Sequence, residues 1–156
     1  MTPKVIRFAE SDWRVFAAIR LRALTDALGE QDPQYQKEAG FTAAQWRRRL
    51  RNHAQFATLV DGRPVGLIAA QRENPDSVYL YSLWLDPTVR GRGLARPLVA
   101  AAVDWARNEG VQTITLRVAS GNVAARAVYE SLGFRFVAAS ENAEPRDEVA
   151  MTLSVS

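Results

Sequence analysis

The sequence predicts an α/β (α+β) fold with a mixed central sheet of about six or seven strands, antiparallel in its N-terminal part, parallel between the fourth and fifth strands, and flanked by about four helices. Two apolar runs flank Asp61-Gly62, a dipeptide typical of two-residue hairpin turns. A third run at 78–85 is almost continuously apolar, as a strand buried on both faces would be. A helical pattern then leads to a β-branched run at 113–118, and this order predicts a right-handed crossover between parallel strands.

The first elements are a short strand at 5–8 and a helix that Ser11 or Asp12 caps and that reaches about Leu28. Apolar residues recur in this helix at the spacing of one helix face. From 25 to 40 the pattern loosens around glycine and proline, and we expect a long loop there. Long loops often carry functional residues.

A second helix is predicted at 43–52, because Thr42 and Gln45 have the spacing of a capping box. Three of its arginines point away from its apolar residues: Arg47, Arg48 and Arg51. They either receive an acidic group or form a solvated helix face, and the solvated face is the favoured interpretation. The only histidine, His53, follows this helix and is expected to be a solvated residue at its end.

The hairpin strands are predicted at 55–60 and 64–71, and Asn74-Pro75-Asp76 forms a second turn, so three consecutive antiparallel strands are expected. The remaining elements follow in order: a helix from Leu94 to about Glu109 ended by Gly110, the strand at 113–118, a helix at 122–132 ended by Gly133, strands at 134–138 and 149–155, and a polar loop at 140–147.

Composition limits the classes of protein. The 156 residues fit one domain, 1–156, and a net charge of +3 is too small to indicate nucleic-acid binding. The absence of cysteine and the single histidine exclude cysteine-ligated and multi-histidine metal sites, so no metal is expected. No apolar stretch approaches the roughly 20 residues of a membrane span, and the first residues lack a signal-peptide pattern. We therefore expect a cytoplasmic protein without a membrane partner.

A turn rich in glycine and arginine separates the run at 78–85 from the next helix. It reads Arg90-Gly91-Arg92-Gly93-Leu94-Ala95-Arg96. The first N–H groups of a helix have no internal partner, and the helix dipole adds positive charge there. The two glycines leave these N–H groups open and the three arginines add full charge, so the turn predicts a site for a pyrophosphate-bearing cofactor.

Two other phosphate-binding loops are excluded by the residues present. A P-loop requires Gly-Lys-Ser/Thr, but the only lysines are Lys4 and Lys37. A dinucleotide fingerprint requires a third glycine, but Arg96 and Pro97 follow Gly93 instead. A tight connection with solvated arginines remains the structural alternative.

Two motifs in order resemble the GNAT family of N-acetyltransferases. The first is the turn from Arg90 to Ala95, which matches the family's cofactor signature. The second, a downstream pattern of Asn-x-x-Ala-x-x-x-Tyr-x-x-x-Gly-Phe, is filled by Asn122, Ala125, Tyr129, Gly133 and Phe134. The motifs cover 78–134, and the order of elements fits the family fold from 5 to 155.

The resemblance implies a binding mode for acetyl-coenzyme A (acetyl-CoA), used as the acyl donor. The amides of Arg90 to Ala95 would hold its pyrophosphate. A bulged fourth strand would splay from the fifth, and the backbone of Leu83, Trp84 and Leu85 would bind the pantetheine amides and the acetyl carbonyl. Asn122 would contact the cofactor arm, and Arg126 is a weaker candidate for the adenosine phosphates.

The resemblance also implies direct acyl transfer to an amine, with Tyr129 protonating or hydrogen-bonding the leaving sulfur. Relatives often carry a carboxylate on the fourth strand as general base, but this strand has none. Glu73 and Asp76 lie near it and could act through water, and the base stays unassigned. Tyr81 and Ser82 either line the substrate pocket or pack.

Several alternatives stay open. A GNAT fold without that carboxylate could instead be a non-catalytic acyl-CoA sensor or interaction module. The acceptor is a small-molecule or peptide amine: an acidic pocket of Glu30, Asp32 and Glu38 would favour polyamines or aminoglycosides, whereas the clustered arginines favour an anionic amino acid. The run at 20–24 is similar to bacterial members of the family, in which homodimers are common.

Overall fold

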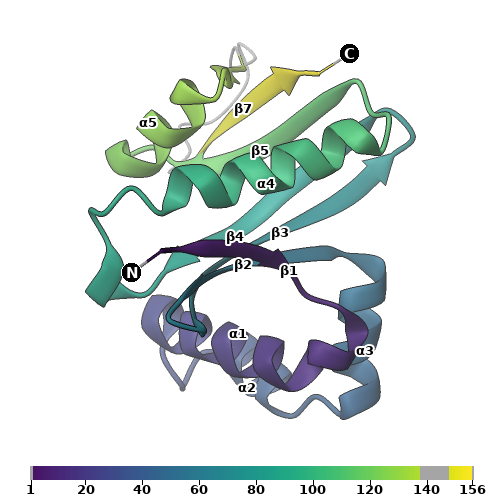
Figure 1. Cartoon of the computed structure of the whole chain (residues 1–156), viewed down its shortest axis with the longest axis vertical. Coiled ribbons are helices and arrows are strands. Elements are labelled where there is room, and N and C mark those ends of the chain that lie inside the picture. Colours follow the sequence, from purple (N-terminus) through teal and green to yellow (C-terminus); the bar gives the residue numbers. More distant parts are fainter. Residues whose placement is uncertain (1, 138–147, 156) are drawn as a thin grey trace.

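A computed structural model describes residues 2–137 and 148–155, which form one mixed seven-stranded sheet in the order β1-β2-β3-β4-β5-β7-β6 (Figure 1). The strands are β1 (Lys4–Arg7), β2 (Ala54–Val60), β3 (Arg63–Asn74), β4 (Ser77–Leu85), β5 (Thr113–Ala119), β6 (Arg135–Phe136) and β7 (Glu148–Ser154). The one parallel pair among the described strands joins β4 to β5. The predicted fold class is confirmed.

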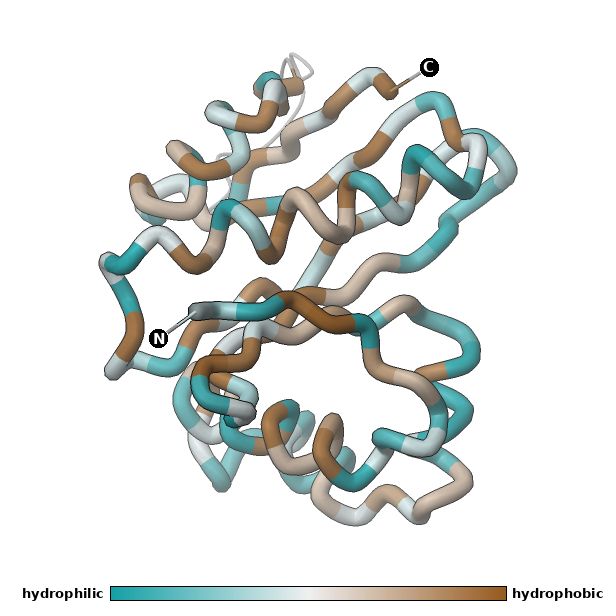
Figure 2. The backbone as a smooth tube through the Cα atoms, in the orientation of Figure 1, coloured by the Kyte–Doolittle hydropathy of each residue, from teal (hydrophilic) through white to brown (hydrophobic). Residues whose placement is uncertain are grey.

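Five helices cover the sheet: α1 (Trp13–Leu28), α2 (Pro33–Ala39), α3 (Ala43–Asn52), α4 (Ala95–Asn108) and α5 (Val123–Ser131). Short 3₁₀ turns, η1 (Glu10–Asp12) and η2 (Pro87–Val89), precede α1 and follow β4. One apolar core packs α4 and α5 on one face of the sheet, and a second packs α1 and α3 on the other (Figure 1). Hydrophobic and hydrophilic residues accordingly alternate along the helices (Figure 2).

The loop expected over 25–40 is largely helical. Gly29 ends α1 with a φ of 88°, and Asp32 caps α2, its side chain accepting a hydrogen bond of 2.8 Å from the Gln34 N–H. Pro33 occupies the first turn of α2, where its missing N–H costs nothing. The glycine and proline that indicated a loop are therefore the end of one helix and the start of the next.

Two other predicted elements differ in extent. The strand expected at 134–138 is the shorter β6, Arg135–Phe136. Residue 138 and the loop expected at 140–147 lie outside the described residues. In the described part of the chain, no helix is long and apolar enough to cross a membrane.

Candidate active site

A bulge interrupts β4 where it parts from β5. Leu67 of β3 pairs with Trp84 and Ala69 pairs with Tyr81, so Ser82 and Leu83 together face a single β3 residue. Ser82 adopts a left-handed φ of 59°, which is uncommon for a residue with a Cβ. Pairing between β4 and β5 ends at Leu80 and Leu116, although β5 continues beside β7. The two parallel strands therefore diverge beyond the bulge and leave backbone groups unpaired.

The glycine turn joins β4 to α4 at this divergence. Gly91 and Gly93 have φ values of 78° and 75°, in the left-handed region that favours glycine. A Cβ built on either residue would meet nothing within 4 Å. The requirement for glycine is therefore conformational, and the turn leaves its backbone open to a ligand.

A cleft of ≈ 490 Å³ opens between the diverging strand, the glycine turn and α5. Most of the predicted cofactor residues line it: Leu83, Trp84, Leu85, Arg90, Gly91, Gly93, Leu94, Ala95, Arg96 and Asn122. Its remaining lining comes from Ala124, Ala125 and Val128. Ala124 and Val128 were not singled out from the sequence, although their i, i+4 spacing puts them on one face of α5. Small side chains there leave room for a cofactor arm.

Two predicted cofactor residues, Arg92 and Arg126, do not line the cleft. Arg126 donates to the Ser120 carbonyl at 2.7 Å and lies over the Phe136 ring, so it folds back across the start of its own helix. Arg92 is exposed on the turn. Among the arginines that do line the cleft, Arg90 donates to Asp26 at 2.8 Å and to the Leu85 carbonyl at 3.0 Å.

Comparison with known proteins agrees with this geometry. Residues 19–134 match the family model described as "Acetyltransferase (GNAT) family". The chain belongs to the GNAT acetyltransferase family. It shares the fold of a Thermoplasma acidophilum PaiA N-acetyltransferase in complex with coenzyme A (TM-score 0.73, 13% identity, 99% of both chains). It also shares the fold of the Escherichia coli ribosomal-protein-S18-alanine N-acetyltransferase (TM-score 0.70, 23% identity, 99% of this chain and 95% of that one).

Curated relatives are similar over about half of this GNAT chain. Rat N-acetylaspartate synthetase is 33% identical over 88 residues, 56% of this chain and 29% of its own length. The Salmonella typhimurium enzyme named [Ribosomal protein bS18]-alanine N-acetyltransferase is 36% identical over 86 residues, 52% of this chain and 58% of its own. The chain thus covers less than two thirds of the length of either relative.

Tyr129, the predicted partner of the leaving sulfur, follows Val128 on α5 and, unlike Val128, does not line the cleft. Its side chain is 5% exposed, and its ring packs edge-on against Phe134 at 5.8 Å. Burial raises the pKa of Tyr129 to about 12, so the phenol carries its proton at any physiological pH. It can donate a hydrogen bond but is a weak proton source.

A second cavity of ≈ 220 Å³ lies where α1 and α2 cover the same stretch of β4. Leu83 and Trp84 line both this cavity and the cofactor cleft. Its polar lining is Arg20, Gln34 and Ser82, and Arg20 donates to the Ser82 hydroxyl at 3.2 Å. The bulge therefore separates two cavities that share residues. Ser82 lines the second cavity, and its predicted role in a substrate pocket stays a prediction.

The acidic pocket considered from the sequence does not form. Glu38 is 2% exposed and accepts from Arg20 at 3.0 and 3.2 Å and from Arg49 at 3.2 Å. Burial alone would raise the pKa of Glu38, but the hydrogen bonds and charge of Arg20, helped by Gln34 and Arg49, hold it below its ordinary value. Asp32 caps α2, and Glu30 lines a different cavity. The three carboxylates thus serve three separate sites.

His53 is not the solvated residue that was expected. It is half-buried, its Nδ1 contacts the Tyr81 hydroxyl, and the two rings pack edge-on with centroids 5.6 Å apart. Burial, together with the Arg49 charge, lowers the pKa of His53, so it is neutral near pH 7. The contact between His53 and β4 is tertiary, so it could not be predicted from the position of His53 at the end of a helix.

The two carboxylates considered as water-mediated bases lie at the opposite end of β4. Asp76 precedes Ser77, and its carbonyl accepts from the N–H groups of Gln112 and Thr113. At about 3.3 Å per residue, Asp76 is roughly 20 Å along the strand from Leu83. Glu73 is exposed near the end of β3 and equally remote. Neither is placed to take a proton from an amine at the bulge.

Proposed function

We propose that this GNAT domain transfers an acetyl group from acetyl-CoA to a primary amine of a small molecule or peptide, by direct attack on the thioester. The observation that carries the proposal is the pair of cavities that share Leu83 and Trp84 at the β4 bulge. One cavity ends in an anion-binding turn that suits a pyrophosphate, and the other is open to an acceptor. A reaction between two bound molecules needs such an arrangement.

The cleft fits the acyl donor in chemistry. The open amides of the glycine turn and the start of α4 would receive the pyrophosphate, with Arg96 beside them. The unpaired backbone of Leu83, Trp84 and Leu85 would receive the pantetheine arm, and Asn122 lines the same cleft. Arg92 and Arg126 do not line the cleft and play at most a secondary role in this proposal.

The reaction forms one C–N bond and breaks one C–S bond. The nitrogen of a neutral amine attacks the thioester carbonyl, a β4 backbone N–H stabilises the oxyanion, and the sulfur leaves as a thiolate. The surplus amine proton passes to water, because the carboxylates that contact the residues of the bulge, directly or through Arg20, are already paired, Glu38 with Arg20 and Arg49, and Asp26 with Arg90. The acceptor is therefore used in its deprotonated form.

Tyr129 assists the leaving group by hydrogen bonding in this proposal. A thiol has a pKa of about 8.5. Because the pKa of Tyr129 is raised to about 12, full transfer of its proton to the thiolate is unfavourable. The Tyr129 hydroxyl can still donate a hydrogen bond to the sulfur, and this bond strengthens as negative charge develops there. It requires that the sulfur approach the buried hydroxyl from the cleft.

The test is thermal unfolding with and without acetyl-CoA, followed by thiol release over a panel of amines on the same sample. The panel includes aspartate and a peptide with an N-terminal alanine, the acceptors that the relatives' names suggest. A ligand that binds only the folded state must raise the Tm. We expect a shift, and thiol release with at least one amine that Tyr129→Phe slows.

The outcomes separate the proposed enzyme from the alternative sensor. Absence of a Tm shift at saturating acetyl-CoA would contradict both. A shift without thiol release for any amine would favour a non-catalytic acyl-CoA-binding module. Tyr129→Phe keeps the ring, so an unchanged acetyl-CoA shift in this variant shows that its fold and cleft are intact.

A further inference from the structure

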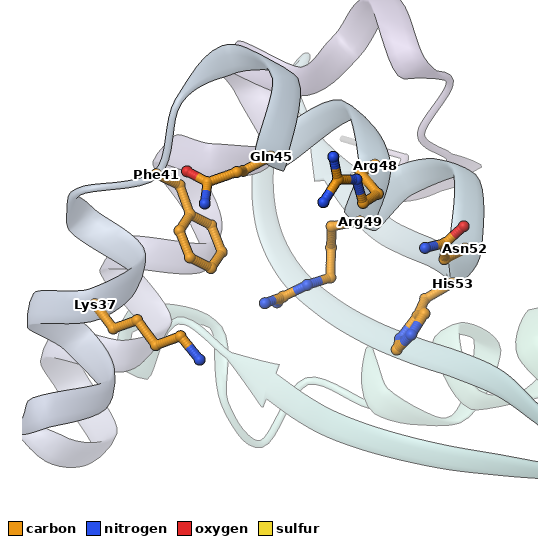
Figure 3. A pocket seen from close by; sticks show the side chains of 7 residues that line it. All are labelled: Lys37, Phe41, Gln45, Arg48, Arg49, Asn52 and His53. Carbon is orange, nitrogen blue, oxygen red and sulfur yellow. The ribbon is translucent and has the colours of Figure 1, made fainter.

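A small basic pocket of ≈ 250 Å³ lies between α2 and α3, on the side of the sheet that carries the acceptor cavity (Figure 3). Its polar lining is Lys37, Gln45, Arg48, Arg49, Asn52 and His53, and we call these residues the anion pocket. Side chains from both helices converge on one space, and no acidic residue lines it (Figure 3). Every polar group there except His53 is a cation or an amide that can donate hydrogen bonds.

The positive charge of the anion pocket is only partly neutralised by the described residues of the protein. Over residues 2–137 and 148–155, no carboxylate lies within 4.0 Å of Lys37 or Arg48. Arg49 pairs with Glu38, but Glu38 also pairs with Arg20, so one negative charge serves two guanidinium groups. Other arginines of α3 are occupied elsewhere: Arg51 pairs with Glu10, and Arg47 lies over the Trp13 ring.

Two chains of contacts join the anion pocket to the β4 bulge. His53 contacts the Tyr81 hydroxyl, and Tyr81 immediately precedes Ser82. Arg49 contacts Glu38, which contacts Arg20, which donates to Ser82. The Tyr81 side chain thus stands between His53 of the pocket and the β4 backbone where the thioester is expected. The carboxylate of an α-amino acid lies too close to its own amine to span that separation.

We propose that the anion pocket binds a carboxylate or phosphate group that the acceptor carries several bonds away from the amine to be acetylated. The inference rests on the proposed function, since it names the acceptor class for that reaction. The cavity that would suit a polycationic acceptor instead is lined by Asp26, Glu30 and Asp86, and two of these three carboxylates already have partners. In this cavity, which Trp84 also lines, Asp26 accepts hydrogen bonds from Arg90 and the Trp84 indole, and Asp86 accepts one from Arg22.

The experiment compares two peptides that differ in one charge: Ala-Glu amide and Ala-Gln amide, assayed by thiol release with saturating acetyl-CoA. We expect kcat/KM to be higher for Ala-Glu amide by about tenfold at low salt, mainly through KM, and the difference to shrink as the ionic strength rises to about 0.5 M. Ala-phosphoserine amide forms a third arm, and preference for it over Ala-Glu amide would assign phosphate as the anionic group.

Matched variants locate the effect. Arg48→Gln and Lys37→Gln should each raise the KM for Ala-Glu amide several-fold, by more than they raise the KM for Ala-Gln amide, while the KM for acetyl-CoA stays the same. Arg47→Gln, one residue away on the same helix and outside the pocket, removes the same charge and should change none of these values. Equal loss in Arg47→Gln and Arg48→Gln would overturn the pocket in favour of a general charge effect.

Calorimetric titration of each peptide into the coenzyme A complex tests the pocket without turnover. Binding of Ala-Glu amide that Arg48→Gln weakens, together with no thiol release from any amine of the panel, would support the pocket and contradict the proposed enzyme. Equal binding and equal kcat/KM for the two peptides, in a protein that does release thiol, would overturn the pocket and leave the enzyme. Failure of both peptides to bind would also overturn the pocket.

Discussion

The two sides of the β4 bulge are built in different ways. The proposed cofactor cleft uses backbone groups and small residues from the end of β4, the turn from Arg90 to Ala95 and the start of α5. The acceptor side uses long side chains from three helices, and its buried carboxylate binds partners 18 and 11 positions away in the sequence. A backbone site depends on conformation and is sensitive to glycine. A side-chain site depends on charge and on the tertiary contacts that hold it.

The largest effect is expected from Gly93→Val on the cofactor side. A β-branched residue at a φ of 75° is strained by about 1–2 kcal/mol, and its side chain would cover the amides that we propose receive the pyrophosphate. We expect the acetyl-CoA-dependent Tm shift to disappear and the Kd to rise by about a hundredfold or more, measured by calorimetric titration.

Gly62→Val is the matched control for this substitution. Gly62 has a φ of 78° in the β2–β3 hairpin, and a Cβ there also meets nothing within 4 Å. It should lose similar stability and keep the Kd for acetyl-CoA. If Gly62→Val weakened acetyl-CoA binding as much as Gly93→Val does, strain alone would explain the loss, and the backbone site would be contradicted.

The next largest effect is expected from Glu38→Gln on the acceptor side. The substitution leaves Arg20 and Arg49 without their shared carboxylate, and breaking a buried ion pair in this way costs about 3 kcal/mol of unfolding free energy. Glu10→Gln removes an exposed pair with Arg51 and should cost about 0.5 kcal/mol or less. Urea unfolding measures both losses of unfolding free energy. Equal losses would show that the buried Glu38 pairs contribute no more to stability than the exposed pair.

The same carboxylate gives stability a defined pH dependence. The folded-state pKa of Glu38 lies below its ordinary value of 4.5, so the folded state binds this proton less readily than the unfolded state. Its contribution is complete above about pH 5 and is lost as the pH falls through the folded pKa. The unfolding free energy of Glu38→Gln should therefore depend less on pH below 5 than that of the parent protein.

Local signals in the sequence predicted most of the fold. Helix α3 occupies the predicted residues, because Thr42 and Gln45 exchange their capping bonds within one turn, at 2.8 and 3.2 Å. The hairpin was predicted from the adjacent residues Asp61-Gly62, and the β4–β5 crossover was predicted from the order of strand, helix and strand. Helix α2 was missed because seven residues between two breakers are too few to show a helical period.

The candidate site also has one part that local sequence signals predict and another part that they do not. The glycine turn and the residues at the end of β4 line one cleft, because the motif places them there through the backbone, and their roles in binding stay predictions. The partners of Glu38 and the contact between His53 and Tyr81 depend on how α1, α2 and α3 dock on the sheet. The sequence names those residues without indicating which of them meet.

A smaller effect is expected from Tyr129→Phe, which tests the junction of the two sides. If the phenol only donates a hydrogen bond to the leaving sulfur, kcat should fall by roughly tenfold, with little change in either KM. Because the pKa of Tyr129 is raised to about 12, the phenol stays protonated throughout the assay range. The rate should therefore rise with pH as the acceptor amine is deprotonated, with no falling limb between pH 7 and 10 in the parent protein. A falling limb that Tyr129→Phe abolishes would contradict this role.

The smallest expected effect is a shift in the pKa of His53, which NMR can follow without ambiguity because the chain has one histidine. Burial and then Arg49 lower this pKa below 6.5, so the folded state loses a small part of its stability as the pH falls below that value. An anionic ligand in the anion pocket would offset the Arg49 charge and raise the pKa of His53, whereas acetyl-CoA on the other side of β4 should leave it unchanged. A shift with acetyl-CoA but not with Ala-Glu amide would reverse this assignment of the two sides, because it would place the donor where we put the acceptor.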